Sequence, residues 1–230
     1  IIILFLLSAC QPKEADKLLP SNSEANYLIF QDKLISYSLD GINYGFMDYA
    51  EEVIIEPKFQ EAGNFRNDYA IVKSNEKFGV IDTTGKFIID PTYEYMEWGS
   101  ITEDIFIVKT NGKYGYIDID EDILITPQFD AARTFHKIFS VAPVKDDEKY
   151  GVINRKGEYI IEPIYDYWIF FNDDGYAGFL IGELLDGKWG IIDNKGNIII
   201  NPQYEGFILH VADNNLISVR IDGNFGYVNL

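Results

Sequence analysis

Acidic side chains recur at one fixed position along this sequence, and carboxylates at regular spacing would suit a row of metal ligands. The residue three positions after each aromatic-glycine pair is Asp or Asn, namely Asp48, Asp82, Asp118, Asn154, Asp193 and Asn229. Oxygen ligands of this kind suit Ca²⁺. A tight turn, however, needs a side-chain cap at the same place, and two of the six residues are neutral Asn. We therefore interpret the row as turn caps and predict no metal site.

Two further patterns fall short of a catalytic or metal site. Residues 118–122 resemble the opening of a calcium loop, but Ile123 stands where Gly is needed and Phe129 where Glu is needed. The two histidines, His136 and His210, would suit acid–base chemistry, yet no motif places a nucleophile beside them. The sequence also has no nucleophile elbow, phosphate-binding glycine loop or His-Glu-x-x-His motif. We predict no enzyme activity and no cofactor.

The composition narrows the class of protein. The chain has 230 residues, with 37 acidic against 19 basic side chains, a formal charge of −18 and 47% hydrophobic residues. The apolar content excludes a disordered chain. The negative charge argues against nucleic acid or an anionic membrane surface as a partner, because both need clustered Lys and Arg. A single Cys excludes an internal disulfide framework.

The elements that would hold these residues come from one motif repeated six times. Aromatic-glycine pairs end at Gly45, Gly79, Gly115, Gly151, Gly190 and Gly226, spaced 34, 36, 36, 39 and 36 residues apart. A proline follows each of the first five glycines by 12 residues, and an aromatic residue follows each proline by two: Phe59, Tyr93, Phe129, Tyr165 and Tyr204. Fixed spacing in this range indicates a repeat architecture, in which stacked units complete one another's core.

Each repeat is expected to be β-structure. Residues 149–154 form a short β-rich run, residues 155–157 a turn, and residues 158–162 a second run that Pro163 ends. A second hairpin precedes each aromatic-glycine pair, with Asn111-Gly112 as the strongest turn signal. The turns near Glu51 and Glu121 lack the Gly that three other repeats have at the fourth turn position. Without any 3.6-residue apolar period, the fold class is all-β, with each glycine at a bulge or close backbone approach.

Residues 188–205, Lys-Trp-Gly-Ile-Ile-Asp-Asn-Lys-Gly-Asn-Ile-Ile-Ile-Asn-Pro-Gln-Tyr-Glu, carry a family resemblance. The pattern resembles the WG repeat family of bacteria, and it extends over residues 35–230, although only this copy keeps Trp. The resemblance implies a repeat β-domain, often on secreted or envelope proteins, with no catalytic activity and no generally assigned ligand. The tandem array of about 36-residue hairpin or meander repeats is either an open superhelical array or propeller-like. We favour the open array, since the end hairpins repeat each other without a missing strand to exchange.

The first residues resemble a targeting signal. Residues 1–7 are all apolar, too few to span a bilayer, and Leu7-Ser8-Ala9-Cys10 resembles the lipobox of bacterial lipoproteins. That resemblance implies that Cys10 is lipidated and that the lipid anchors the chain to a membrane. Gln11 after the Cys resembles the signal that directs lipoproteins to the outer membrane. We divide the chain into a lipoprotein signal peptide truncated at its N-terminus (1–9), the lipidated Cys with a flexible tether (10–26), and the repeat domain (27–230).

Residues that vary between repeats are free to carry function. The variable segment of the fourth repeat is the longest and is rich in aromatic residues, and Trp98 lies at a nearby phase two repeats earlier. Exposed aromatic rings bind peptides and sugars well. The candidate ligand-binding residues are Trp98, Tyr167, Trp168, Phe171 and Tyr176, although any of them can instead fill the core.

These observations predict a lipid-anchored protein of the cell envelope, placed at the outer membrane and open to surface exposure. Its repeat domain is expected to be a non-catalytic module that binds or scaffolds a protein. A glycan-binding module with aromatic platforms is the alternative, and an envelope hydrolase is the third hypothesis.

Overall fold

The computed structural model describes residues 34–100, 102–212 and 216–229. The chain divides into two units, residues 1–31 and residues 32–230, and the described residues all belong to the second. The predicted signal peptide (1–9) and the whole of the predicted lipidated tether (10–26) lie outside the described residues. Across the part of the chain that is described, no helix is long and apolar enough to cross a membrane.

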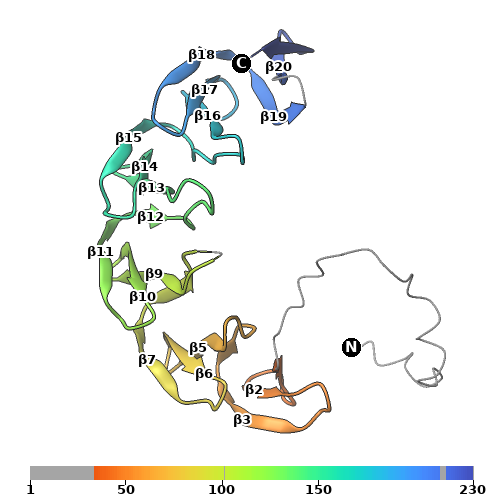
Figure 1. Cartoon of the computed structure of the whole chain (residues 1–230), viewed down its shortest axis with the longest axis vertical. Helices are drawn as coiled ribbons and strands as arrows, with labels where there is room; N and C mark the ends of the chain where they lie inside the picture. The colour runs from red at the N-terminus through yellow and green to blue at the C-terminus, as the bar shows by residue number, and fades with distance from the viewer. Residues whose placement is uncertain (1–33, 101, 213–215, 230) are drawn as a thin grey trace, which may run out of the picture. The chain divides into compact units, whose positions relative to one another are not determined.

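The described residues form 21 strands in six antiparallel sheets that follow one another in chain order (Figure 1). The first two sheets contain β1 (Ile35–Tyr37), β2 (Tyr44–Met47) and β3 (Val53–Phe59), then β4 (Glu61–Ala62), β5 (Tyr69–Ser74), β6 (Lys77–Asp82) and β7 (Phe87–Tyr93). The middle two contain β8 (Tyr95–Trp98), β9 (Ile105–Thr110), β10 (Lys113–Asp118) and β11 (Ile123–Phe129), then β12 (Ala131–Ala132), β13 (Ala142–Asp146), β14 (Lys149–Ile153) and β15 (Tyr159–Tyr165). The last two contain β16 (Tyr176–Ile181), β17 (Lys188–Asp193) and β18 (Ile198–Tyr204), then β19 (Gly206–Ala212), β20 (Leu216–Ile221) and β21 (Asn224–Asn229).

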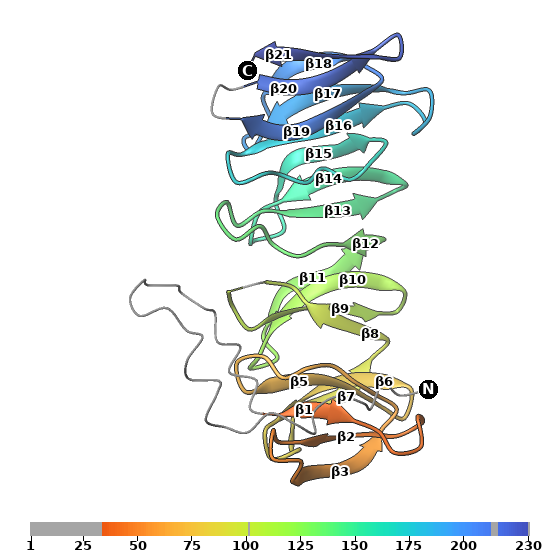
Figure 2. The ribbon, with the colours of Figure 1, turned by 90° about the vertical axis from the view of Figure 1, so that its right-hand side faces the viewer.

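Within each sheet the strands pair in sequence order, so every sheet is a meander. The aromatic-glycine pair lies on one strand of each sheet, and in the first five sheets the next strand along the chain is the outer one. A single residue separates four of the five outer strands from the first strand of the following sheet, as between β7 and β8. Figure 2 shows β1–β3 and β19–β21 at opposite ends of the row, so unit 32–230 is an open array, as the sequence favours.

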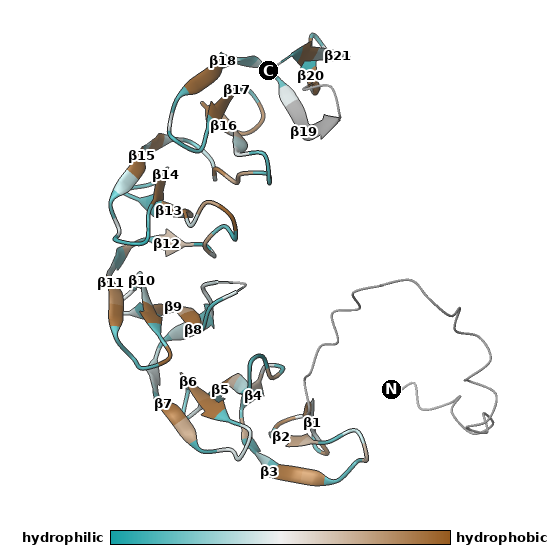
Figure 3. Cartoon of the chain, in the orientation of Figure 1, coloured by the Kyte–Doolittle hydropathy of each residue, from teal (hydrophilic) through white to brown (hydrophobic). Residues whose placement is uncertain are grey.

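The hydrophobic core lies between consecutive sheets, in five separate clusters. One such cluster joins Phe46 and Phe59 of the first sheet to Val72 and Ile81 of the second. Another joins Val152 and Tyr165 of the fourth sheet to residues of the fifth, and the remaining three clusters bridge the other neighbouring pairs. In Figure 3 the hydrophobic colour falls on strands and the hydrophilic colour on turns. A single sheet therefore cannot bury its apolar residues alone, which is the physical basis of the repeat.

The recurring glycine and proline lie at the same β-bulge, between the aromatic-glycine strand and the outer strand of each of the first five sheets. In β14 and β15, Tyr150 pairs with Tyr165 and Val152 with Ile161, so the segment around Pro163 bulges over Gly151. A Cβ atom at Gly151 would lie 2.6 Å from the Ile161 carbonyl oxygen, closer than any side chain allows. The expected close backbone approach is confirmed. The prediction that Pro ends the strand was wrong: Pro163 lies inside β15, and it is tolerated there because β15 is an edge strand.

The turns after the aromatic-glycine strands are confirmed as Asp- or Asn-capped turns. Oδ1 of Asp193 accepts the N–H groups of Lys195 (2.9 Å) and Asn197 (2.8 Å), and four other turns repeat this pair of bonds. The fourth turn residue has a left-handed backbone, and at Glu51 and Glu121 a glutamate adopts it with φ of 64°. The two turns without Gly thus form in the same way as the others.

The last sheet departs from the other five. Among the described residues, β21 pairs only with β20, and no Pro-bearing strand covers its other edge.

Candidate functional site

Most of the recurring polar residues build the repeat. The residue that follows each aromatic after the proline caps the next hairpin: Oε1 of Glu94 accepts the Asn111 N–H (2.9 Å), and Oδ2 of Asp166 accepts the Gly182 N–H (2.7 Å). Gln60 and Glu205 cap their hairpins in the same way. The Lys149 ammonium, followed by the Gly182 N–H, holds the pKa of Asp166 below its usual range.

Asp130, the remaining residue of this set, lies in a group of three carboxylates. Oxygens of Asp130, Asp146 and Asp147 lie within 4.8 Å of one another. The Lys113 ammonium lies 2.5 Å from Asp130 and lowers the pKa of that carboxyl, while the Tyr159 hydroxyl donates to Asp146 (2.7 Å). The group thus has a lysine and a tyrosine as internal partners, and it serves the hairpin between β13 and β14.

Three side chains of one variable segment, Tyr167, Trp168 and Phe170, gather with two in-phase aromatic residues, Tyr150 and Trp189, in one aromatic cluster. The Trp168 ring centre lies 4.8 Å from that of Tyr150 and 6.1 Å from that of Phe170, and Tyr167 lies 5.9 Å from Trp189. The Arg133 guanidinium, from the preceding segment, stands 4.5 Å from the Trp168 ring centre. Phe170 is 55% exposed and Tyr167 38%, so the cluster presents ring surface to solvent.

The other predicted binding residues lie elsewhere. Phe171 packs against the core between the fourth and fifth sheets, and Tyr176 against the core between the fifth and sixth. Trp98 contacts Phe106 (4.8 Å between ring centres) and has Arg66 over its ring (4.8 Å). The structure thus brings Tyr167 and Trp168 together but places Trp98 outside their cluster. Sequence analysis missed Tyr150 and Trp189 as neighbours because they belong to the in-phase aromatic-glycine pairs.

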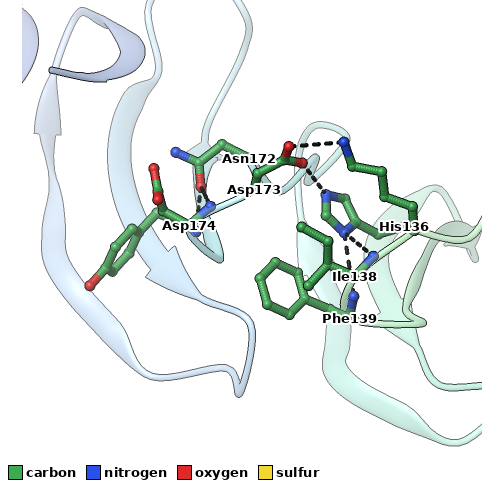
Figure 4. A network of polar contacts seen from close by, with 8 residues as sticks. His136, Ile138, Phe139, Asn172, Asp173 and Asp174 are labelled. Carbon is green, nitrogen blue, oxygen red and sulfur yellow. Dashed lines mark hydrogen bonds and ion pairs between the residues drawn. The ribbon is translucent and has the colours of Figure 1, made fainter. Parts of the chain in front are cut away.

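His136 takes part in a contact between two variable segments (Figure 4). Its Nδ1 accepts the N–H groups of Ile138 (3.3 Å) and Phe139 (3.5 Å), and its ring stacks on Phe139. Its Nε2 lies 3.7 Å from Asp173, whose carboxylate also pairs with Lys137 (2.9 Å). These contacts hold the loop of the fourth sheet against the turn that precedes β16. The side chain of His210 lies outside the described residues.

An open pocket of about 570 Å³ lies beside the third sheet. Its lining includes the acidic residues Glu103, Asp104 and Asp118 and the apolar residue Leu124, together with Arg155. Arg155 bonds Glu103 (2.9 Å) and covers the Phe135 ring at 4.3 Å. Asp118 caps its own turn, and Asp104 accepts a hydrogen bond from the Asn67 side-chain amide (3.0 Å), so all four charged groups in the lining have structural partners.

Comparison with solved structures yields low-similarity matches. They include a structure described as the eukaryotic initiation factor (11% identity, TM-score 0.42, 83% of this chain and 68% of that one). The tricorn protease matches at 12% identity and TM-score 0.29, over 82% of this chain and 22% of that one. The AfRom2 CNH domain matches at 8% identity and TM-score 0.27, over 84% of this chain and 89% of that domain. No curated protein matches the sequence.

The repeat itself has a match. The WG containing repeat is found at residues 44–78, 78–114, 114–150, 150–184 and 189–225. All of these boundaries except the end of the fourth match at Leu184 fall at the aromatic residues of the aromatic-glycine pairs, where the structure also repeats. Well over half of the residues are matched, and each matched unit runs from the aromatic-glycine strand of one sheet into the first strands of the next, so the chain belongs to the WG containing repeat family.

Proposed function

We propose that this chain is a lipid-anchored protein of the bacterial cell envelope whose WG-repeat domain is a non-catalytic, protein-binding module. The observation that carries the proposal is the aromatic cluster around Trp168. Its partly exposed rings come from variable positions, whereas the in-phase polar residues are bonded within turns and hairpins.

The cluster suits a protein partner because its rings are fixed before binding. Trp168 is held by Tyr150, Phe170 and Arg133, so little side-chain freedom remains to be lost in a complex. Aromatic and Arg side chains at the centre of an interface supply most of its binding energy. The formal charge of −18 favours a partner with a basic rim around its apolar contact.

Affinity capture with matched variants tests this proposal. The full chain, purified with its detergent-solubilised anchor, is used as bait against solubilised envelope, with quantitative mass spectrometry as the readout. The double variant Tyr167→Ser, Phe170→Ser is expected to lose a specific partner at least tenfold, since it removes exposed ring surface. Leu39→Ser is the matched control, because Leu39 is 88% exposed and lies in the first hairpin. Equal recovery with all three baits would contradict the assignment of the cluster.

The anchor is tested separately. Cys10→Ser is expected to abolish incorporation of labelled palmitate and to release the chain from the membrane fraction, because a thiol is needed for the lipid bond. Labelling of the variant equal to that of the natural chain would overturn the lipoprotein half of the proposal and leave the protein-binding half standing. An outer-membrane location predicts that the natural chain sediments with outer-membrane vesicles.

A glycan ligand is a second candidate, which the exposed rings of Tyr167 and Phe170 favour. Arg133 already covers the Trp168 ring, which leaves less open indole surface for a flat sugar face. Binding of envelope glycans by the natural chain but not by the double variant, with no protein captured, would favour the glycan.

A further inference from the structure

The outer strands carry a set of exposed aliphatic side chains that belong to none of the core clusters. In β3, β7, β11, β15 and β18 the residue three positions before the proline is aliphatic each time and is 36–43% exposed. These residues, called the aliphatic row below, are Ile54, Ile88, Leu124, Ile160 and Ile199. None of them lies in any of the five core clusters, whereas Ile89, the residue after Ile88, does. Packing within the described repeats therefore does not explain why this position is aliphatic in all five sheets.

The strand pairing explains why these side chains are exposed. Two adjacent residues of β6 pair with Phe87 and Ile89 of β7, so Ile88 between them has no partner on β6. The other four outer strands have the same extra residue at the same position. A bulge of this kind leaves the extra residue out of the ladder and turns its side chain away from its neighbours. A polar side chain would fit such a position equally well and would leave less apolar surface in water.

The aliphatic row follows one side of the described sheets. Figure 1 shows β3, β7, β11, β15 and β18 one after another along the same side of unit 32–230. Single exposed aliphatic residues are ordinary on a protein surface, but here one recurs at the same phase on five successive sheets. An exposed apolar surface bordered by polar residues marks a site where another molecule binds.

Acidic residues flank the aliphatic row. The residues two positions before and two positions after each of its members are all exposed, and six of these ten are carboxylates, namely Glu52, Glu56, Asp90, Asp122, Glu158 and Glu162. Lys86 is the one cation among the ten. None of the six carboxylates forms an ion pair with a described residue. The surface therefore offers apolar contact between negative charges, which repels a second copy of this chain and attracts a cationic partner.

We propose that the aliphatic row docks a basic segment of a partner protein in which Leu, Ile or Val residues are flanked by Lys or Arg. The aliphatic residues of the segment pack on the row, and its cations face the carboxylates on either side. Because the chain presents this contact once in each of five sheets, a segment with several such units binds through all of them, and each contact after the first is intramolecular.

The charge also separates this partner from other occupants. Residues 1–33 of the chain itself have three Lys against four acidic residues, so they lack the excess of positive charge that complements this surface. The aliphatic row shares no residue with the aromatic cluster around Trp168, and its role does not depend on the function proposed for that cluster.

Peptide titration tests the proposal. The probe is a fluorescent peptide with four Lys-Ser-Leu-Ser-Lys units joined by Gly-Gly-Ser linkers, titrated with the full chain. Three control peptides replace every Lys by Glu, replace every Leu by Ser, or contain a single unit. We expect saturable binding of the four-unit probe, binding at least tenfold weaker for the single unit, and no binding of the Glu and Ser peptides.

Variants of the chain locate the site. The triple variant Ile54→Thr, Ile88→Thr, Ile160→Thr keeps β-branched side chains at the bulges, and it is expected to keep the circular dichroism spectrum of the natural chain. We expect it to bind the probe at least tenfold more weakly, because three of the five aliphatic contacts are lost. Glu56→Gln, Glu162→Gln leaves the aliphatic row intact and is expected to weaken binding a few-fold and to reduce its dependence on salt.

Matched controls replace exposed aliphatic residues elsewhere. The triple variant Leu39→Thr, Ile42→Thr, Leu185→Thr removes side chains that are more exposed than those of the row and lie between paired strands of hairpins. This variant and Phe170→Ser are expected to bind the probe normally. Loss of binding in Phe170→Ser would assign the probe to the aromatic cluster and overturn the proposal.

Equal binding by the natural chain and the variant with three Thr residues in the aliphatic row would also overturn it, as would no saturable binding up to about 1 mM probe. Binding of the Glu peptide as tight as that of the probe would contradict a basic partner. Self-association of the natural chain that the same variant abolishes would assign the row to a second copy. Probe binding that appears only after deletion of residues 11–26 would assign the row to the chain's own N-terminal segment.

Discussion

Single residues in the turns show how tightly local geometry governs this chain. Three of the five capped turns have Gly at the left-handed fourth position, whereas Glu51 and Glu121 adopt that conformation with a side chain. Side chains other than Gly pay about 1 kcal/mol or more there. Glu51→Gly is expected to raise the free energy of unfolding by about 1 kcal/mol, measured by urea denaturation.

The reciprocal change serves as its control. Gly157 has φ of 79°, and a Cβ atom there would lie 3.1 Å from Ile125, so Gly157→Ala is expected to destabilise the chain by about 1–2 kcal/mol. Equal effects of the two substitutions would contradict the left-handed requirement.

The Asp and Asn side chains that cap the turns also act as single residues. Asp193→Ala removes an acceptor of two turn N–H groups, and we expect it to lower the free energy of unfolding by about 1–2 kcal/mol. Asp193→Asn keeps the acceptor oxygen, as Asn154 does naturally, and is expected to lose less than half as much. A calcium-dependent melting temperature in the natural chain that Asp193→Asn abolishes would instead favour the metal interpretation.

At the scale of strands, the bulge contact gives a sharp pair of predictions. Gly151→Ala places a methyl group 2.6 Å from the Ile161 carbonyl oxygen and is expected to cost about 1–3 kcal/mol in unfolding free energy. Gly226→Ala is the same substitution at the same phase, at a position where the added methyl group meets no described atom within 4 Å, and it is expected to change the melting temperature by less than 1 °C. Calorimetry on both variants checks the pair, and a matching loss in Gly226→Ala would show that the cost does not come from the close approach of an outer strand.

Sequence analysis identified the strands and turns because their signals are local. Asn111-Gly112 and the Asp-capped turns specify their own geometry within four or five residues. It did not separate Trp168 from Phe171, which are three positions apart. One joins the aromatic cluster and the other packs against a core, and that choice depends on which loops of neighbouring sheets meet. The position of Pro163 inside a strand was missed for the same reason, since the bulge requires the partner strand.

At the scale of the whole chain, two electrostatic effects oppose each other as the pH falls. The pKa values of Asp130 and Glu205 are lowered, by the Lys113 ammonium and the Gly223 N–H respectively, and that of Asp166 is lowered by Lys149. Groups with lowered pKa values stabilise the fold above their unfolded pKa of about 4 and lose that contribution as the pH falls through the folded value. Protonation of other carboxylates relieves the repulsion that accompanies a charge of −18.

We therefore expect the melting temperature at low salt to rise as the pH falls from 8 to about 5, and to fall below about pH 4. Salt at about 0.5 M is expected to flatten the first phase by screening. Asp166→Asn is expected to make the loss below pH 4 smaller, since it removes one of the groups with a lowered pKa. An unchanged loss of melting temperature below pH 4 in this variant would show that Asp166 does not contribute to the acid sensitivity of the fold.

We propose a division of labour in which in-phase residues build the row of sheets and the exposed rings of the aromatic cluster bind a protein. Site-specific photocrosslinking in intact cells tests that division most directly. A photoreactive phenylalanine analogue replaces Phe170 in one strain and Leu39 in another, both at exposed positions. The account predicts a discrete protein adduct from position 170 and none from position 39. Adducts of equal yield from both positions, or no protein adduct at position 170, would contradict it.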